Sequence, residues 1–150
     1  MMTTIREALP EDFNFVVESQ MAMALETEGI SLDKEILESG VKAVIQDSSK
    51  ARYFIAQIDG APAGMLMITF EWSDWRDGWV WWIQSVYIKP GYRQSGVFKE
   101  MYFFLKKIVQ DSPDLKGLRL YVDKRNLRAQ KVYDSLGMDG DHYSTFEWMK

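Results

Sequence analysis

Cysteine is absent from the 150-residue sequence, and histidine occurs once, at His142. Without cysteine the chain has no disulfides, no zinc-thiolate site and no cysteine nucleophile. A single histidine excludes multi-histidine metal centres, so no metal is expected. No apolar run reaches the length of about 18 residues that a membrane span needs, and the N-terminus lacks the basic start and apolar stretch of a signal peptide. The sequence therefore predicts a cytoplasmic protein with no membrane partner.

Hydrophobic residues make up 47% of the sequence and aromatic residues 14%, which excludes a disordered chain. A chain of this length buries roughly two thirds of its unfolded surface, so we expect a single domain over residues 1–150. Residues 1–80 carry 6 basic and 14 acidic side chains, whereas residues 81–150 carry 12 and 8. This asymmetry is compatible with chance, or with an anion bound by the second half and a cation by the first. The net charge of −4 argues against a nucleic-acid partner.

The spacing of apolar residues predicts an alternation of strands and helices in the order βααβββαβαβ. Strands are expected over residues 3–8, 51–58, from the Asp59-Gly60 turn through Phe70, 79–88, 118–122 and, as a strand or hairpin, 138–149. Helices are expected over residues 10–26, from a cap at Ser31 or Asp33 to about 47, over 95–110, and around 129–136 with a stop at Gly137. This order indicates a mixed α/β fold with helices on both faces of a sheet.

Residues 84–99 predict a buried strand that runs through a short loop into a helix. A helix N-terminus offers unpaired N–H groups and the positive end of its dipole, so this geometry binds phosphate readily. Gly96 lets the backbone approach a phosphate closely, and Arg93 and Lys99 add positive charge. An ordinary strand-to-helix turn also contains one glycine, so the loop alone is weak evidence.

Two motifs together resemble those of the GCN5-related N-acetyltransferase (GNAT) family. The family's pyrophosphate loop reads Arg or Gln, two residues, Gly, one residue, and Gly or Ala, and the corresponding positions here are Arg93, Gly96 and Phe98. The family's later helix reads Asn, Ala, Tyr and Gly-Phe, and the corresponding positions are Asn126, Ala129, Tyr133 and Gly137-Met138. Phe98 and Met138 depart from the usual small and aromatic residues. The resemblance covers essentially the whole chain and implies a mostly antiparallel central sheet and a homodimer.

The resemblance implies acetyl-CoA as the cosubstrate. It places the strand backbone of Val86, Tyr87 and Ile88 beside the pantetheine, and Asn126 in contact with the pantetheine arm. It places the pyrophosphate against Arg93 and the amides of Gln94, Ser95, Gly96, Val97, Phe98 and Lys99.

The resemblance also places Tyr133 near the sulfur of the thioester. Attack of an amine on a thioester needs a neutral amine, stabilisation of the oxyanion, and a proton for the departing thiolate. The N–H of Val86 or a neighbour can serve the oxyanion, and a phenol is protonated at neutral pH and can donate to sulfur. Packing in the core beside Ala129 and Leu136 is the alternative role for Tyr133. Without cysteine, direct transfer in a ternary complex is expected.

The general base and the acceptor site are the least defined parts of the prediction. Glu71 is the first candidate for the base and Glu28 the second, because residues 79–83 contain no acid. Trp72 and Trp75 flank a polar turn, and their rings, with Glu28 and neighbouring acids, can recognise a cationic amine.

Two functions remain open on the sequence. The first is an enzyme that moves an acetyl group from acetyl-CoA to an amine of a small molecule or peptide. The alternative is a non-catalytic acyl-CoA-binding module, which the missing acid in residues 79–83 and the bulky Phe98 keep possible.

Overall fold

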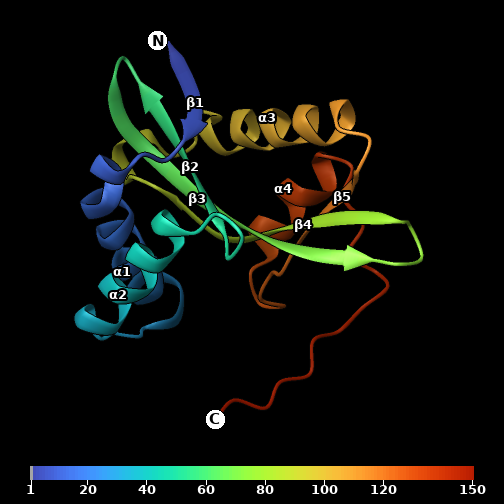
Figure 1. The fold of residues 1–150 in the computed structure, drawn as a ribbon. Helices are drawn as coiled ribbons and strands as arrows, with labels where there is room; N and C mark the ends of the chain where they lie inside the picture. Colours follow the sequence, from blue (N-terminus) through green and yellow to red (C-terminus); the bar gives the residue numbers. More distant parts are fainter. Residues whose placement is uncertain (1) are drawn as a thin grey trace. The chain divides into compact units, whose positions relative to one another are not determined.

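The computed structural model describes residues 2–150, which divide into two compact parts, one ending at Leu120 and the other comprising Tyr121–Lys150. The first part contains a five-stranded sheet in the order β1-β2-β3-β4-β5 (Figure 1). Its strands are β1 (Thr3–Glu7), β2 (Arg52–Ile58), β3 (Ala61–Ser73), β4 (Gly78–Ile88) and β5 (Leu115–Leu120). All neighbours are antiparallel except β4 and β5, which are parallel. The predicted mixed, mostly antiparallel sheet is confirmed.

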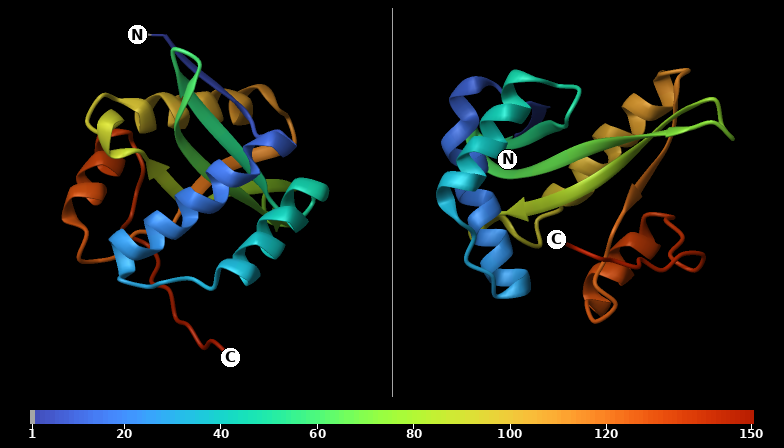
Figure 2. Two further views of the ribbon diagram at one scale, coloured as in Figure 1. Left: turned by 90° about the vertical axis from the view of Figure 1, so that its left-hand side faces the viewer. Right: turned by 60° about the horizontal axis from the view of Figure 1, so that its bottom comes forward.

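Helices cover both faces of this sheet, as Figure 2 shows. They are α1 (Phe13–Glu28) and α2 (Lys34–Gln46) on one face and α3 (Val97–Asp111) on the other. The core under α1 and α2 contains Val16, Val17, Val41, Tyr53, Ile55 and Met65. On the α3 face, the Phe54 ring lies 6.0 Å from that of Phe104 and 6.3 Å from that of Trp81. Alternate residues of β2 thus pack into opposite cores, which is why Tyr53–Ala56 in the middle of this strand are apolar in succession.

Several boundaries differ from those the sequence predicts. Pro10–Asp12 form a 3-10 turn before α1, and α1 extends to Glu28, where Gly29 ends it with a φ of +66°. The β3 strand continues to Ser73 and β5 begins at Leu115. Pairing with a neighbouring strand sets the bounds of β3 and β5, and the geometry of the helix ends sets those of α1. Hydrophobic spacing predicts neither of these.

The second part holds one helix, α4 (Leu127–Ser135), and no strand among residues 121–150. The final strand expected over residues 138–149 is therefore not formed in this structure. Its residue types favour a strand, but a strand also needs a neighbouring edge for its N–H and C=O groups. No helix among residues 2–150 is long and apolar enough to cross a membrane. The single domain and the cytoplasmic location remain predictions.

A partly buried ion pair joins β1 to the turn before α1. The guanidinium of Arg6 donates to both oxygens of Asp12, at 2.7 and 3.0 Å, and the Leu9 N–H donates to the same carboxylate at 2.7 Å. Asp12 is only 6% exposed. The hydrogen bond from Arg6, followed by that from Leu9, holds the pKa of Asp12 below its usual range.

Replacing Asp12 should destabilise the protein in a pH-dependent way. We expect Asp12→Asn to lower the free energy of unfolding by about 2–3 kcal/mol at pH 7, because Arg6 then lacks its anionic partner. The contribution of the ionised Asp12 to the free energy of unfolding is fully present above the carboxyl's unfolded pKa of about 3.9. It is lost as pH falls through the lower pKa of the folded state. Urea unfolding at pH 7 and pH 3 checks this: the difference between variant and parent should shrink at pH 3. Glu11→Gln, at an exposed neighbour, should change stability little at either pH.

Candidate active site

The strands β4 and β5 separate from each other partway along the sheet. Their ladder ends at the pair Ile83 and Leu120, whereas β4 stays paired with β3 as far as Ile88. The register of β3 and β4 shifts at this point, because Met67 lies opposite Ser85 and the next residue, Ile68, opposite Ile83. Gln84 is therefore the extra residue of a β-bulge, which bends a strand and increases its twist. Beyond the bulge, no strand among the described residues occupies the β5 side of β4.

The backbone of Val86 and Ile88 faces this open side. In an antiparallel ladder, successive pairs alternate between bonded pairs and pairs whose N–H and C=O groups point outward. The N–H of Lys89 bonds the carbonyl of Ala63, so the pair of Tyr87 with Met65 is also a bonded one. Val86 and Ile88 consequently direct their backbone groups away from β3. Of the three residues predicted to line the pantetheine, these two offer main-chain hydrogen bonds and Tyr87 does not.

The predicted phosphate loop leads directly from this strand into α3. Gln94 and Gly96 both have left-handed backbones, with φ of +63° and +84°. Gly96 precedes α3 and provides no side-chain cap, so no capping side chain occupies the amide end of this helix. Left-handed residues next to a helix start bring successive N–H groups toward one point, as anion-binding nests do.

The side chains of Arg93 and Phe98 have structural contacts of their own. The Arg93 guanidinium donates to the Ile88 carbonyl at 2.8 Å and to Glu26 of α1 at 2.7 Å, and it lies 5.5 Å from the centre of the Tyr87 ring. Arg93 therefore ties the loop to β4 and α1. The ring of Phe98 lies 6.5 Å from that of Tyr102, one turn along α3. The donors available for a phosphate are thus mainly those of the backbone.

Glu71 lies in a polar cluster on the α1 and α2 face of the sheet. Its Oε1 accepts from Arg119 at 2.7 Å and from the indole N–H of Trp82 at 3.0 Å. Glu71 is opposite Val80, six residues before Val86, which is about 20 Å along β4. The structure therefore does not bring Glu71 next to Val86.

The predicted acceptor residues are spread over two places in the first part. Trp72 and Trp75 lie at the end of the long β3-β4 hairpin (Figure 1), 51% and 91% exposed, and Trp72 packs edge-to-face against Trp79. Glu28 is exposed at the last residue of α1. Trp79, the strand neighbour of Trp72, is also about 20 Å along β4 from Val86. Trp72 therefore does not lie next to Val86.

The second part carries Asn126 and Tyr133. The side-chain oxygen of Asn126 caps α4 by accepting from the Ala129 N–H at 3.0 Å, which leaves its NH2 group to donate elsewhere. Tyr133 lies on α4, half-buried, and burial raises the pKa of its phenol above the usual 10. The phenol thus stays protonated throughout the neutral range.

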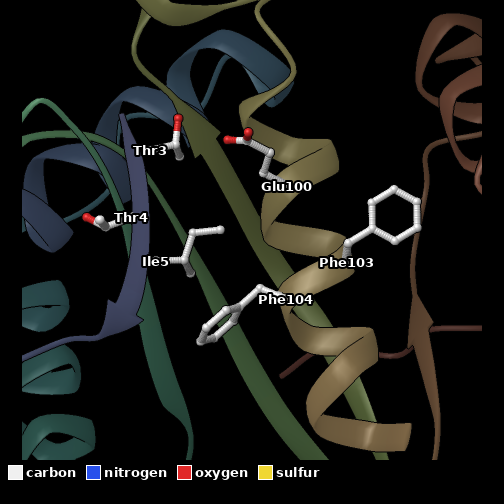
Figure 3. Close-up of a pocket in the computed structure, with 6 residues that line it drawn as sticks. All are labelled: Thr3, Thr4, Ile5, Glu100, Phe103 and Phe104. Atoms are coloured by element: carbon white, nitrogen blue, oxygen red, sulfur yellow. The ribbon is translucent and has the colours of Figure 1, made fainter. Parts of the chain in front are cut away.

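Two open grooves lie elsewhere on the first part. One, of about 510 Å³, is formed by β1 and α3 and lined by Thr3, Thr4, Ile5, Glu100, Phe103 and Phe104 (Figure 3). The other, of about 480 Å³, is lined by Glu7, Ser48, Ser49, Arg52, Phe70, Trp79 and Trp81. None of the predicted site residues lines either groove. No group of three acidic or histidine side chains among residues 2–150 could hold a metal ion.

Gln84 and Gln94 have backbone conformations in the structure that the sequence did not predict. Gln84 forms the bulge that opens the sheet, and its amide bonds the Thr69 hydroxyl at 2.8 Å. A polar residue inside an otherwise apolar strand is the one available signal for such a bulge. Gln94 has a positive φ, which its residue type does not predict.

Comparison with known proteins agrees with this geometry. The family model described as the acetyltransferase (GNAT) family matches residues 10–138. The solved structure of a possible acetyltransferase from Clostridium difficile 630 is similar to this chain, with 37% identity and a TM-score of 0.93, covering 100% of this chain and 99% of that one. No match is found among curated proteins.

Two further solved structures share the fold at lower identity. One is the aminoglycoside N-acetyltransferase AAC(6')-Iy in complex with CoA, with 15% identity and a TM-score of 0.80, covering 99% of this chain and 95% of that one. The other is the ribosomal-protein-alanine N-acetyltransferase from Brucella melitensis biovar Abortus 2308, with 14% identity and a TM-score of 0.77, covering 99% and 100%. The family model matches most of the chain, and the separated strands β4 and β5 and the uncapped start of α3 agree with it. This chain therefore belongs to the GNAT family of acetyltransferases.

Proposed function

We propose that this protein transfers an acetyl group from acetyl-CoA to an amine, directly and within a ternary complex. The observation that carries the proposal is the succession of two sets of backbone donors, first the outward-facing N–H groups of Val86 and Ile88 on the open edge of β4 and then the amides at the start of α3, which have no side-chain cap. An extended thioester cofactor with a charged pyrophosphate fits these two sets, because one end needs main-chain hydrogen bonds and the other needs amides that bind anions.

We place the pantetheine along Val86 and Ile88 and the pyrophosphate at the amides that follow Gln94. Arg93 is assigned the role of holding this loop, since its guanidinium already bonds Ile88 and Glu26. The NH2 group of Asn126 is assigned to the pantetheine arm, in agreement with the family motif.

The proposed reaction gives each of these groups one role. The amine nitrogen attacks the thioester carbonyl, and the N–H of Val86 donates to the oxygen on which negative charge develops. The carbon–sulfur bond then breaks, and Tyr133 donates its phenolic proton to the departing thiolate. The attacking nitrogen loses a proton to the general base, and one proton then passes through solvent from the base to the Tyr133 phenolate, which restores both groups and balances charge and protons over the cycle.

For the general base we propose two candidates, Glu71 and Glu28, each acting through bound water. Glu71 does not lie beside Val86 and its Oε1 is already engaged, so direct contact of Glu71 with the amine is not part of the proposal. The base is the residue whose replacement by Gln lowers kcat at pH 7 while leaving CoA affinity unchanged. Both candidates are rejected if neither Glu71→Gln nor Glu28→Gln lowers kcat.

The distance between Val86 and the tryptophans limits which acceptors can contact both. A cationic amine that stacks on Trp72 or Trp75 while its nitrogen reaches Val86 has to span about 20 Å along β4. We therefore propose that these tryptophans contribute only to extended cationic acceptors, such as a linear polyamine or a lysine-containing peptide, by cation–π attraction.

The test is thiol release from acetyl-CoA across a panel of compact and extended amines, with a no-acceptor control and calorimetric titration of CoA. We expect CoA binding together with acceptor-dependent release that is fastest for extended cations. Faster release with compact or acidic amines contradicts the acceptor proposal alone. Binding without release for any amine favours the alternative, a non-catalytic acyl-CoA-binding module, and absence of CoA binding rejects the assignment of the loop.

A further inference from the structure

The side chain of Gln20, on α1, faces the sheet and is nearly buried. It is 8% exposed, and its NH2 group donates to the Met67 sulfur at 4.0 Å. The carbonyl oxygen of the same amide accepts from no residue within 2–150. Every fully buried side-chain nitrogen or oxygen in that range has a partner, so this oxygen borders space that solvent reaches. A carbonyl in this position is an acceptor for a donor from outside the chain.

The Gln20 amide lies over the bulge in β4. Its contact, Met67, is opposite Ser85, and Ser85 directly follows the bulge residue Gln84. Met67 packs against the core under α1 and α2, and residues directly opposite each other share a face of the sheet. Ser85 therefore lies on the face that α1 covers, beside Val86 in the chain and close to Gln20.

Gln84 and Ser85 bring two further polar side chains to this place. The NH2 group of Gln84 donates to the Thr69 hydroxyl at 2.8 Å, and the alternation along β3 puts Thr69 on the α1 face. The carbonyl oxygen of Gln84 and the hydroxyl of Ser85 have no hydrogen-bond partner among the described residues. Gln20, Gln84 and Ser85, which we call the bulge cluster, thus offer three side-chain oxygens where β4 and β5 separate.

The bulge cluster is uncharged, and both carboxylates held near it are paired. On the part of the α1 face formed by β3, β4 and β5, the charged side chains fixed by contacts are Glu26 with Arg93 and Glu71 with Arg119, each pair at 2.7 Å, and Lys89, which lies 5.7 Å from the centre of the Phe15 ring. The cluster itself contains two amides and a hydroxyl. None of these groups takes up a proton near neutral pH.

The acceptor nitrogen has one face of the sheet from which to reach the thioester. Under the proposed function the pyrophosphate lies at the start of α3, and α3 covers the face opposite to α1 (Figure 2). The cofactor thus leaves the α1 face beside Val86 to the amine. A neutral amine donates its N–H groups to oxygens such as those of the bulge cluster and keeps its lone pair for the thioester carbon.

We propose that the bulge cluster holds the acceptor nitrogen, and that the preferred acceptor is a weakly basic amine such as the α-amino group of a peptide. The inference rests on the proposed transferase function. Because the cluster is uncharged, it neither takes the proton of an ammonium nor balances its charge, so the nitrogen has to arrive neutral. At pH 7 roughly a tenth of α-amino groups with a pKa of about 7.7–8.0 are neutral, against roughly one in 2,500 lysine amines with a pKa of about 10.4.

This preference is compatible with the extended cationic acceptors proposed above. The general base acts later, on the nitrogen that has already attacked. A lysine elsewhere in the same peptide stays charged, and its side chain is then the group that reaches Trp72 while the α-amino group reacts.

One peptide tests the choice of amine by internal competition. It has a free α-amino group and a single lysine six residues further on, about 20 Å away in an extended chain. Fragmentation mass spectrometry at low conversion and pH 7 locates the acetyl group. We expect the α-amine product to exceed the ε-amine product by about a hundredfold or more.

The possible failures of this test are distinguishable. A protein that acetylates strongly basic amines as fast as weakly basic ones, in this peptide or in the amine panel, overturns the inference and leaves the transferase function standing. A protein that binds CoA but acetylates no amine at all rejects the transferase function, and the inference with it.

Substitutions within the bulge cluster test its residues. Gln84→Glu adds a carboxylate that balances an ammonium, so the ratio of ε-amine to α-amine product should rise about tenfold. Gln20→Met removes the carbonyl that receives the amine and should raise the KM for the peptide about tenfold, while CoA affinity stays within about twofold in both variants. Gln110→Glu, at an exposed position of α3, is the matched control and should change neither quantity. An unchanged ratio in Gln84→Glu together with an unchanged KM in Gln20→Met overturns the inference, and either result alone removes that residue from the acceptor site.

Discussion

Replacing Tyr133 by phenylalanine should lower kcat by about 10²–10⁴-fold while leaving CoA affinity within about threefold of the parent value. The substitution removes only the hydroxyl, and under our proposal this hydroxyl protonates the departing thiolate. Without that proton the thiolate leaves as a free anion, which raises the barrier to cleavage of the carbon–sulfur bond. Ground-state binding of CoA does not use the same proton, so Kd is largely preserved.

The pH dependence of kcat provides a second test of Tyr133 as the acid. Burial raises the pKa of Tyr133 above 10, and the protonated form is the active one. Activity that depends on this acid is therefore retained through neutral and mildly alkaline pH and is lost only as pH rises through the raised pKa. A fall in kcat that sets in well below pH 10 and disappears in Tyr133→Phe contradicts the assignment, because the titrating acid would then be too strong.

Tyr102 offers a matched control for this experiment. It is also a buried tyrosine with a pKa raised by burial, but it lies on α3 and packs against Phe98 and Phe103. We expect Tyr102→Phe to keep kcat. If the two variants lose activity equally, removal of a buried hydroxyl has disturbed packing, and the catalytic role of Tyr133 is rejected.

The elements that the sequence predicts well are those whose stability is decided locally. The apolar spacing of Val16, Val17 and Ala24 was enough for α1, and the capping oxygen of Asp33, which accepts from the Ile36 N–H at 3.1 Å, fixes the start of α2. The strand expected over residues 138–149 did not form, because local preference supplies no partner edge.

In the candidate site, too, the sequence identifies residues in a local motif but not the contacts that the fold brings about. Gly96 was identified from one residue type at one place in a motif, and the structure gives it a left-handed φ of +84°. The partners of Arg93 and Glu71 could not be predicted. Glu26 is 67 residues from Arg93, and Arg119 is 48 residues from Glu71. Such pairs arise from the arrangement of helices and strands, so a sequence motif identifies a charged residue without showing which charge it meets.

The phosphate assignment predicts a large and specific effect at Gly96. We expect Gly96→Asp to weaken CoA binding about ten- to a hundredfold, which corresponds to about 1.4–2.8 kcal/mol. The new carboxylate lies at the positive end of α3, where it accepts from the amides that would hold the pyrophosphate and repels its charge. Calorimetric titration of CoA measures the loss, and part of it should disappear at high salt, which screens the repulsion.

Gly60→Asp separates this effect from backbone strain. Gly60 has a φ of +83°, against +84° at Gly96, and a Cβ at either position meets nothing within 4 Å. Both substitutions place an L side chain in the left-handed region, so each should cost about 1–2 kcal/mol of stability. Only Gly96 precedes α3, whereas Gly60 lies in the turn between β2 and β3. Equal CoA affinities for the two variants would place the pyrophosphate elsewhere, because a carboxylate at the start of α3 cannot leave an anion bound to the same amides undisturbed.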